Sequence, residues 1–473
     1  MIELNFFAPE LILLLAAIIL IILGSYWKRE NTPSMVALVA TFSFVFACVL
    51  VKGQSELGAQ LYQDMAIIND FTAFAKITLF VAALMSLLLA YHWAVRQEHG
   101  AFEYPIMIIF ATIGLSLVIS ANNFLAFYVA IEMASLCMYV MAAYERDSGN
   151  SSEAGLKYFI LGSLASCILL FGISLIYGFT GTINFAELAQ ANISMGMITG
   201  LVLVLIALCF KLSAAPFHMW SPDVYQGAPT VVVAFFAVAP KIAVLALLMR
   251  LLTGTFAEIT QYWQQVIIFA SIASMVIGSL AGIVQKNIKR LIAYSSISHV
   301  GYILLGVVAA TEEATAHLLV YISSYVMLNL GLFALILLLQ KNNQPVEKIS
   351  DLAGLSHKHP KLALAFAIIM FSMAGIPPFA GFFAKSLLLM SVVKAGFTPL
   401  VVIALICSVV SCFYYIRIVK LIYFDEAEDI LQITPHKLLA GGVLLASLAV
   451  NMVVFAPAII LDPAKLAARA LFP

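Results

Sequence analysis

The sequence predicts an all-α polytopic membrane protein with about fourteen transmembrane helices. Hydrophobic residues make up 63% of the 473 positions and charged residues only 10%, whereas about a quarter of the residues in a soluble domain are charged. Apolar runs long enough to cross a bilayer, roughly 17–25 residues each, recur from one end of the chain to the other. Two of these runs are interrupted by prolines and carry a lysine beside the interruption.

The predicted spans follow one another without a polar stretch long enough to form a soluble domain. One apolar run is too long for a single straight helix; it contains Gly375-Ile376-Pro377-Pro378, so we expect two half-helices there. The predicted spans are 9–27, 33–51, 71–94, 104–120, 122–144, 155–179, 195–216, 229–252, 263–285, 290–309, 315–340, 361–394 (the long run), 398–423 and 437–457.

Helices 7 and 12 are predicted to be broken. In helix 7, Lys211 is followed by Ser213-Ala214-Ala215-Pro216; in helix 12, Lys385 follows the break. Proline removes a backbone donor, which a membrane protein tolerates only where protein or water satisfies the backbone. Because interrupted helices in corresponding positions indicate inverted repeats around a midplane ion site, we expect two inverted five-helix repeats.

These repeats divide the chain into four parts. Helices 1–3 occupy 1-103, the first repeat (helices 4–8) occupies 104-252, the second inverted repeat (helices 9–13) occupies 253-423, and helix 14 with a short tail occupies 424-473. The N-terminus, MIELNFFAPE, is acidic and lacks the positive region of a cleavable signal peptide, so the first span is expected to remain as a helix.

Lysine and arginine are concentrated in alternate loops. Loops after even-numbered helices hold about three, namely Lys52, Arg250 and Lys394. By the positive-inside rule the odd loops, including the polar stretch 341–361, face the cytoplasm and both termini face outward. Loops after odd-numbered helices hold about thirteen: Lys28, Arg29, Arg96, Arg146, Lys286, Lys289, Arg290, Lys341, Lys348, Lys358, Lys361, Lys420 and Lys437.

Composition and spacing argue against several classes of function. The six cysteines form no CxxC and no iron–sulfur or zinc spacing, and there is no Gly-rich nucleotide loop, haem motif or HExxH. The net charge is zero, and no cluster of basic residues indicates nucleic-acid binding. We therefore expect no metal and no cofactor on this chain, and membrane lipid rather than nucleic acid around it.

A few ionisable residues lie deep in the predicted spans, where a charge costs several kcal/mol. One glutamate, Glu132, cannot neutralise the three central lysines Lys211, Lys241 and Lys385, so some of them must be neutral or hydrated. Burial favours the neutral form of a lysine and a nearby carboxylate favours its charged form. We therefore hypothesise that movement of Glu132 switches Lys211 between holding and releasing a proton, and that Lys241, His299 and Lys385 extend the path.

Structural roles remain open for the same residues. Glu132 and one lysine would also fit a structural ion pair, and His299, in the polar run Tyr294 to His299, would also fit hydrogen bonding to its hydroxyl neighbours. Lys76, Lys157 and Arg417 lie nearer the helix ends, where the expected alternative is that the side chains reach the headgroups.

Four ordered motifs identify a family. EAGLKYFILGSLAS, FKLSAAPFHMWSPDVYQGAP, QKNIKRLIAYSSISHVGY and AGIPPFAGFFAKSLLL resemble the antiporter-like membrane subunits of respiratory complex I, over nearly the whole chain. The family's key residues correspond to Glu132, Lys211, Lys241 and Lys385, with Lys157 and His299 at supporting positions. Three features favour the branch of the family that is neither subunit M nor subunit L. Lys385 lies where subunit M has a glutamate, and the long lateral helix of subunit L is absent. The segment PFHMWSPDVYQGAP also resembles this branch more than the other two. Pro240, directly before Lys241, is a departure that would alter the local kink.

The resemblance implies a proton-translocating subunit in a bacterial inner membrane, and not a complete enzyme. NADH, FMN, iron–sulfur clusters and quinone would be bound by partner subunits. The implied partners are the antiporter-like subunits M and L and the small subunits K, J, A and H. Three alternatives stay open: a cation/proton antiporter subunit of the Mrp type, a membrane subunit of a related hydrogenase, and a non-pumping scaffold.

Overall fold

A computed structural model describes residues 5–26, 32–55, 60–62, 65–96, 102–341, 344–426, 431–433 and 438–472. Within these residues, twelve helices are long and apolar enough to cross a membrane, and shorter apolar helices accompany them. The polytopic all-α prediction is confirmed. Of the residues behind the predicted orientation, Lys28, Arg29 and Lys437 lie outside the described residues, as do the first four of the N-terminal segment.

The helices of the first half follow the predicted spans closely. Their bounds are α2 Ala8–Tyr26, α3 Thr32–Ser55, α4 Asp70–Arg96, α5 Glu103–Ser120, α6 Phe124–Ala142, α7 Gly149–Thr180, the short α8 Phe185–Leu188, α9 Met195–Leu212, α10 Trp220–Gly227, α11 Thr230–Phe236 and α12 Ala239–Arg250, which continues as a π-helical turn at Leu251–Thr255 and a 3-10 turn at Ala257–Ile259.

The second half also contains both long and interrupted helices. Its bounds are α13 Thr260–Ile283, α14 Ile288–Ala309, α15 Glu312–Leu338, a 3-10 turn at Ile349–Leu352, the short α16 Leu355–Lys358, α17 Pro360–Ala374, α18 Ala380–Lys394, α19 Thr398–Phe424, α20 Leu438–Ala449 with a 3-10 extension at Val450–Phe455, and α21 Ala458–Arg469.

Three of the predicted spans are interrupted. Helix 7 is α9 followed by α10, and helix 12 is α17 followed by α18, as expected from the prolines. The third interruption, between α11 and α12 in helix 8, was not predicted. Pro240 lies in the first turn of α12, where the missing N–H costs no helical hydrogen bond. The interruption is therefore a helix start rather than a proline kink within a helix.

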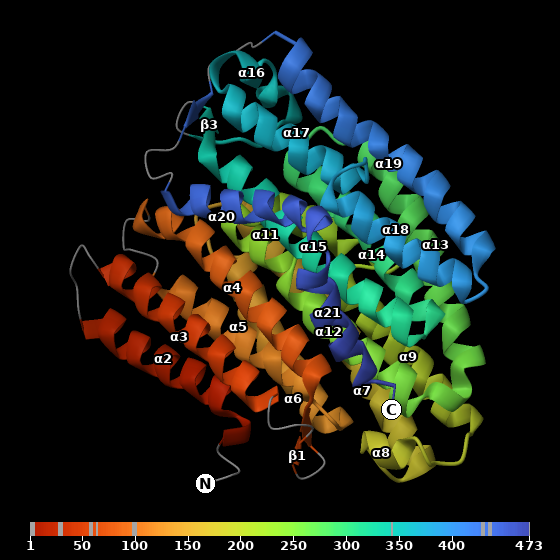
Figure 1. Cartoon of the computed structure of the whole chain (residues 1–473). Helices are drawn as coiled ribbons and strands as arrows, with labels where there is room; N and C mark the ends of the chain where they lie inside the picture. The colour runs from red at the N-terminus through yellow and green to blue at the C-terminus, as the bar shows by residue number, and fades with distance from the viewer. Residues whose placement is uncertain are drawn as a thin grey trace.

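Short strands occur in the connections. The antiparallel pair β1 Gln60–Tyr62 and β2 Ala66–Ile68 lies between α3 and α4. A three-stranded sheet has the order β4-β3-β5, with β3 Leu339–Lys341, β4 Gln344–Pro345 and β5 Gln432–Ile433. In Figure 1, β3 and α16 lie at the upper end of the molecule, and both ends of the chain lie at the lower end with α8. The predicted outward orientation of the termini stays a prediction.

The helices differ sharply in how much of their surface the protein covers. In the most apolar stretch of each helix, the share that is buried inside the protein is 100% for Thr230–Thr255 and 94% for Ile288–Ala309. The same share is only 33% for α2, α3 and α19. The outer helices carry their apolar side chains outward, as lipid contact requires. The buried centre, made by α11, α12, α14 and α15, is where a charge is shielded from lipid.

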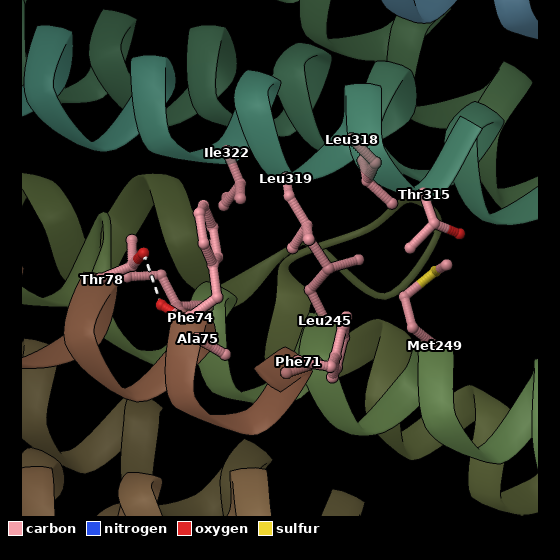
Figure 2. Close-up of a pocket in the computed structure, with 12 residues that line it drawn as sticks. Phe71, Phe74, Ala75, Thr78, Leu245, Met249, Thr315, Leu318, Leu319 and Ile322 are labelled. Atoms are coloured by element: carbon pink, nitrogen blue, oxygen red, sulfur yellow. Dashed lines mark hydrogen bonds between the residues drawn. The ribbon is translucent and has the colours of Figure 1, made fainter. Parts of the chain in front are cut away.

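A small apolar cavity lies between α4, α12 and α15 (Figure 2). Phe71, Phe74, Leu245, Leu319 and Met249 are among the side chains that point into it. Its volume is about 10 Å³ and its lining is almost wholly apolar. An apolar void of this size stays dry, so we interpret it as a packing gap between helix groups.

Candidate functional site

Glu132 and Lys211 lie opposite each other on α6 and α9. Lys211 Nζ is 3.8 Å from Glu132 Oε1 and donates a hydrogen bond of 2.7 Å to Ser135 Oγ. The hydroxyl of Ser166 on α7 donates to the same Glu132 oxygen at 2.5 Å. Ser135 is one helical turn after Glu132, so both face α9. The lysine is buried, whereas the Glu132 side chain is 24% exposed.

The end of α9 satisfies its own carbonyl groups. Ser213 adopts a left-handed conformation with φ 61°, and Ala214 N donates to Cys209 O at 2.8 Å. The indole N–H of Trp220, from α10, donates to Phe210 O at 3.0 Å. Because these donors occupy carbonyls at the helix end, the ammonium of Lys211 remains directed at α6.

Lys241 lies in a cluster of hydroxyl groups at the start of α12. Its ammonium donates to Ser296 Oγ on α14 and to Tyr325 OH on α15 at 3.0 Å. Ser296 and Tyr325 are hydrogen-bonded to each other at 2.8 Å, and Tyr325 OH also donates to Ala237 O at 3.2 Å. The unpredicted interruption of helix 8 therefore supplies a free carbonyl to this cluster.

His299 on α14 continues the polar line between two tyrosines. Its Nδ1 is 2.6 Å from Tyr321 OH and its Nε2 is 3.2 Å from Tyr415 OH. The Tyr415 hydroxyl is also 2.5 Å from Ser295 Oγ. The ring centroids of His299 and Tyr325 are 5.2 Å apart, so the histidine lies next to the Lys241 cluster.

Lys385 on α18 turns back onto the end of α17. Its ammonium donates to Met373 O and Ala374 O, each at 3.2 Å, and to Ser408 Oγ on α19 at 3.5 Å. It also lies 5.0 Å from the centroid of the Tyr302 ring. A helix C-terminus carries partial negative charge, so carbonyls stabilise this cation.

A small pocket separates Lys385 from His299. Its volume is about 10 Å³, and Lys385, His299, Tyr321 and Ser324 are among the polar residues that line it. That volume is about the size needed for one water, and several polar groups surround it.

Lys157 lies apart from these buried groups. Its side chain is 41% exposed and pairs with Glu153 at 2.7 Å and with Asp223 at 2.9 Å; Arg290 pairs with the same Asp223 at 2.6 Å. Partial burial raises the pKa of Asp223, but hydrogen bonds from Lys157 and Arg290 outweigh it and hold the pKa below its usual range. The structure thus brings together Glu132, Lys211, Lys241, His299 and Lys385 as buried polar groups, and places Lys157 at an end of the bundle.

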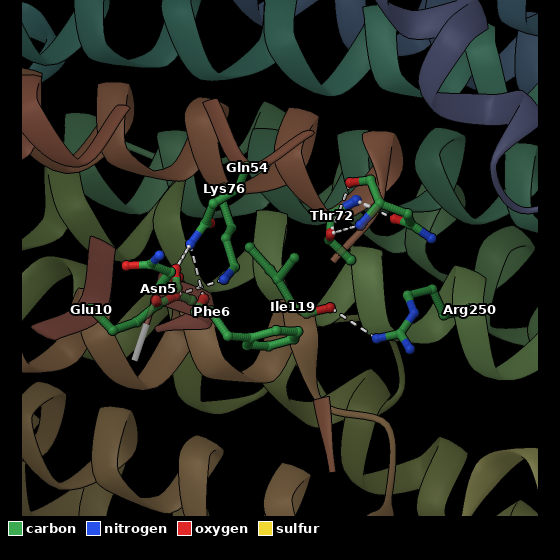
Figure 3. A network of polar contacts seen from close by, with 10 residues as sticks. Asn5, Phe6, Glu10, Gln54, Thr72, Lys76, Ile119 and Arg250 are labelled. Carbon is green, nitrogen blue, oxygen red and sulfur yellow. Dashed lines mark hydrogen bonds and ion pairs between the residues drawn. The ribbon is translucent and has the colours of Figure 1, made fainter. Parts of the chain in front are cut away.

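Two other cations near helix ends bind groups of the protein itself. Lys76 is buried and pairs with Glu10 at 2.6 Å (Figure 3). The same carboxylate oxygen accepts a hydrogen bond of 2.5 Å from Ser116. Arg417 donates to Ile283 O and Gln285 O at the end of α13. The snorkelling prediction is wrong for Lys76, which is buried with a carboxylate partner, whereas headgroup contact of the part-buried Arg417 stays a prediction.

Sequence reasoning did not place several polar residues in the interior, where the structure buries them; Arg250, for example, was counted as a loop residue. Arg250 donates to Ile119 O and Ala121 O at the end of α5 (Figure 3). Glu10 was noted only as part of an acidic N-terminal segment, although an acidic residue inside the predicted span 9–27 was a signal for a buried pair. The tyrosines and serines around Lys241 and His299 could not be told from other hydroxyl residues in apolar helices by sequence.

Across the described residues, no group of three His, Cys, Asp or Glu side chains is arranged to hold a metal ion.

Comparisons with known proteins agree with the motifs. The family model "NADH:quinone oxidoreductase/Mrp antiporter, TM" matches residues 121–411, more than half of the chain. NADH-quinone oxidoreductase subunit N of Rhodospirillum rubrum is 48% identical, with 98% of this chain and 96% of that protein covered. The subunit N of Paramagnetospirillum magneticum is 44% identical, with 98% and 97% covered.

Solved structures show the same fold. A chain of respiratory complex I from Thermus thermophilus superposes with a TM-score of 0.83 and 29% identity, covering 96% of this chain and 98% of that chain. A chain of the Mrp complex from a Dietzia species has a TM-score of 0.87 but 22% identity, covering 98% and 97%. The latter likeness concerns the fold alone. This chain belongs to the NADH:quinone oxidoreductase/Mrp antiporter family and, within it, to the subunit N branch that its motifs favoured.

Proposed function

We propose that this chain carries protons across the membrane as the subunit N of NADH-quinone oxidoreductase, along Glu132, Lys211, Lys241, His299 and Lys385. The observation that carries the proposal is the loose Glu132–Lys211 pair, 3.8 Å between Nζ and Oε1. Charge-assisted hydrogen bonds are normally 2.7–2.9 Å long. A movement of about 1 Å would therefore tighten this pair into a hydrogen bond, or separate it further.

The two serines make such a movement possible without leaving a charge unsolvated. Ser135 accepts from Lys211 and Ser166 donates to Glu132, so each charged group keeps a hydrogen bond when the pair opens. An approaching carboxylate favours the ammonium form of the lysine, and a receding one favours release of the proton. Glu132 is thereby proposed as the switch and Lys211 as the first proton carrier.

Beyond Lys211, hydroxyl groups and water would pass the proton on. Tyr325 and Ser296 surround Lys241, and His299 has a tyrosine on each ring nitrogen. One water in the pocket between His299 and Lys385 would complete the line. Lys385 is then the terminal carrier, held by the carbonyls of α17.

The position of Glu132 supports a partner subunit on the outer face of α6. A carboxylate that is 24% exposed within a transmembrane helix is costly against lipid, and Leu125, Val129 and Leu136 on the same helix are exposed. We place another membrane subunit of complex I there. The proposed neighbours are the antiporter-like subunits M and L and the small subunits K, J, A and H.

The redox chemistry is proposed to belong to partner subunits. NADH, FMN, iron–sulfur clusters and quinone would be bound there, and this chain would contribute proton translocation. We propose a location in the bacterial inner membrane with both termini outward, and the two inverted repeats at 104-252 and 253-423. Lys157 is proposed to support the path from the surface.

Substitution of Lys211 tests this function. In the purified complex, Lys211→Ala is expected to reduce proton pumping on the order of tenfold, because it removes the ammonium that pairs with Glu132 in a low-dielectric site. The measurements are NADH-dependent quinone reduction and proton uptake in proteoliposomes. Lys394→Ala, which removes an exposed lysine paired with Glu313, is the matched control. Full pumping by an assembled Lys211→Ala complex would refute the proposed path.

A further inference from the structure

One face of α7 lines a groove that changes from polar to apolar along the helix. Glu153 and Lys157 line its first part, and Leu161, Leu164 and Ile168 line its second part. These residues are spaced three or four positions apart and therefore share one face of the helix. The two cavities are thus the two halves of one groove along α7.

The opposite wall repeats this change of polarity. Asp223 on α10, with Arg290 from α14, borders the polar half, which has a volume of about 180 Å³. Trp220 on the same helix, with Phe210 and Phe217, borders the apolar half, which has a volume of about 160 Å³. Both walls therefore place polar groups at one end and apolar groups at the other.

The groove spans the boundary between headgroups and hydrocarbon. α7 has 32 residues, about 48 Å of helix, which exceeds the roughly 30 Å hydrocarbon core. Its first turns therefore extend beyond the hydrocarbon. From Lys157 to Ile168 the helix rises about 16 Å, the depth of about one leaflet. The apolar half is open sideways, since Leu164 and Met219 are 58% and 73% exposed.

Charges in the polar half are balanced. Lys157 and Arg290 stand against Glu153 and Asp223, which suits a headgroup that carries both a positive and a negative group. An ammonium has three donors and a guanidinium has five, so both cations keep donors for a phosphate after pairing with Asp223. Glu153, 62% exposed, is free on its outer side to accept from a headgroup amine. A purely anionic headgroup would meet two carboxylates.

We propose that this groove binds a zwitterionic phospholipid with a primary amine, of the phosphatidylethanolamine type. The phosphate lies at Lys157 and Arg290, the amine at Glu153, and an acyl chain fills the cavity beside Leu164 and Trp220. The bound lipid packs between α7 and α10, the segment that follows the break after Lys211. This inference is independent of the proton path and does not require it.

Photo-crosslinking in the intact complex tests the site. The complex is placed in phosphatidylcholine nanodiscs with a trace of phosphatidylethanolamine or phosphatidylglycerol carrying a diazirine on the acyl chain. After illumination, labelled peptides are mapped by mass spectrometry. We expect label on the groove segments of α7 and α9, with about threefold preference for phosphatidylethanolamine from one added charge contact.

Three variants separate the possible occupants. Leu164→Trp fills the apolar half and is expected to remove the groove label, whereas Leu280→Trp, at a similarly exposed leucine of α13 (55% exposed), is expected to retain it. Glu153→Gln is expected to abolish the preference between the two lipids, and tests the headgroup contact even where Leu164→Trp fails to assemble. Equal labelling by both lipids in the wild type, labelling of the groove unaffected by Leu164→Trp, or label on partner-subunit peptides with none on the groove segments would each overturn the proposal.

Discussion

The two broken helices have similar backbones but hold their lysines differently. α9 ends at a left-handed Ser213 and α17 at a left-handed Gly375, and cis Ala215–Pro216 and Pro377–Pro378 bonds follow. Lys211 precedes its break and faces the carboxylate of Glu132 at 3.8 Å. Lys385 follows its break and faces the carbonyls of Met373 and Ala374.

The difference concerns what can change around each lysine. A carboxylate on a neighbouring helix moves when that helix moves, whereas the end of α17 is joined to α18 through the break itself. We therefore propose that the charge of Lys211 is open to control from outside the chain through α6, whereas the carbonyls that hold Lys385 belong to the helix joined to its own. This contrast suggests a controlled first site and a passive last site.

The largest expected effect comes from the carboxylate that only the first site has. Glu132→Gln removes a charge whose interaction with Lys211 is on the order of a few kcal/mol at 4 Å, so proton pumping is expected to fall about tenfold. Glu132→Asp keeps the charge and is expected to retain part of the activity. Pumping in proteoliposomes is the measurement. Wild-type pumping by the Glu132→Gln variant would show that the Lys211 site does not depend on its carboxylate and so does not differ from the Lys385 site in this respect.

The next largest effect is expected from substitution of the two residues with left-handed backbone conformations, Gly375 and Ser213. Gly375 has φ 84°, and a Cβ there would lie 3.0 Å from Lys385 Cδ; a left-handed non-glycine residue costs about 1–2 kcal/mol. Gly375→Ser is therefore expected to lower the denaturation temperature of the complex in detergent and to disturb Lys385. Ser213→Gly relieves the same strain at φ 61°, but glycine loses more backbone freedom on folding, so this control is expected to leave the denaturation temperature unchanged or slightly raised. Equal destabilisation by both would show that the breaks are not sterically distinct.

The smallest expected effect is at Asp223, outside both breaks. Its lowered pKa means that its stabilising ion pairs are complete above the ordinary aspartate pKa and are lost as the pH falls through the lowered value. For an ion pair this exposed the contribution is within about 1 kcal/mol. Asp223→Asn is expected to destabilise the complex slightly at neutral pH and to have no effect at strongly acidic pH. Thermal denaturation across pH measures this, and a constant difference at every pH would contradict it.

Much of this architecture is encoded locally and could be predicted. The breaks at Pro216 and Pro377 follow from proline chemistry, and Glu132 and Lys211 stood out because charges are rare in apolar helices. The interruption before Lys241 was not predicted, although Pro240 lies there, because the apolar run 229–252 continues through it. Backbone groups there are satisfied by Tyr325, which lies 88 positions later in the chain.

Partners distant in sequence account for the error at Lys76 and for the unpredicted contacts of Arg417. Lys76 was expected at the headgroups, but Glu10 lies 66 positions away and meets it in the fold. Arg417 similarly reaches carbonyls of α13, 132 and 134 positions earlier. The position of a cation near a helix end does not say whether another helix offers an acceptor there.

A double-mutant cycle on proton pumping tests the central claim that Glu132 controls Lys211 and not Lys385. Glu132→Gln and Lys211→Met would be combined, and Glu132→Gln and Lys385→Met would be combined in parallel. Residues that act as a unit are strongly non-additive, so the first double variant is expected to pump no worse than its poorer single variant. The second double variant is expected to show the product of the two single losses. Additive losses in the first cycle, or equal non-additivity in both, would contradict the account.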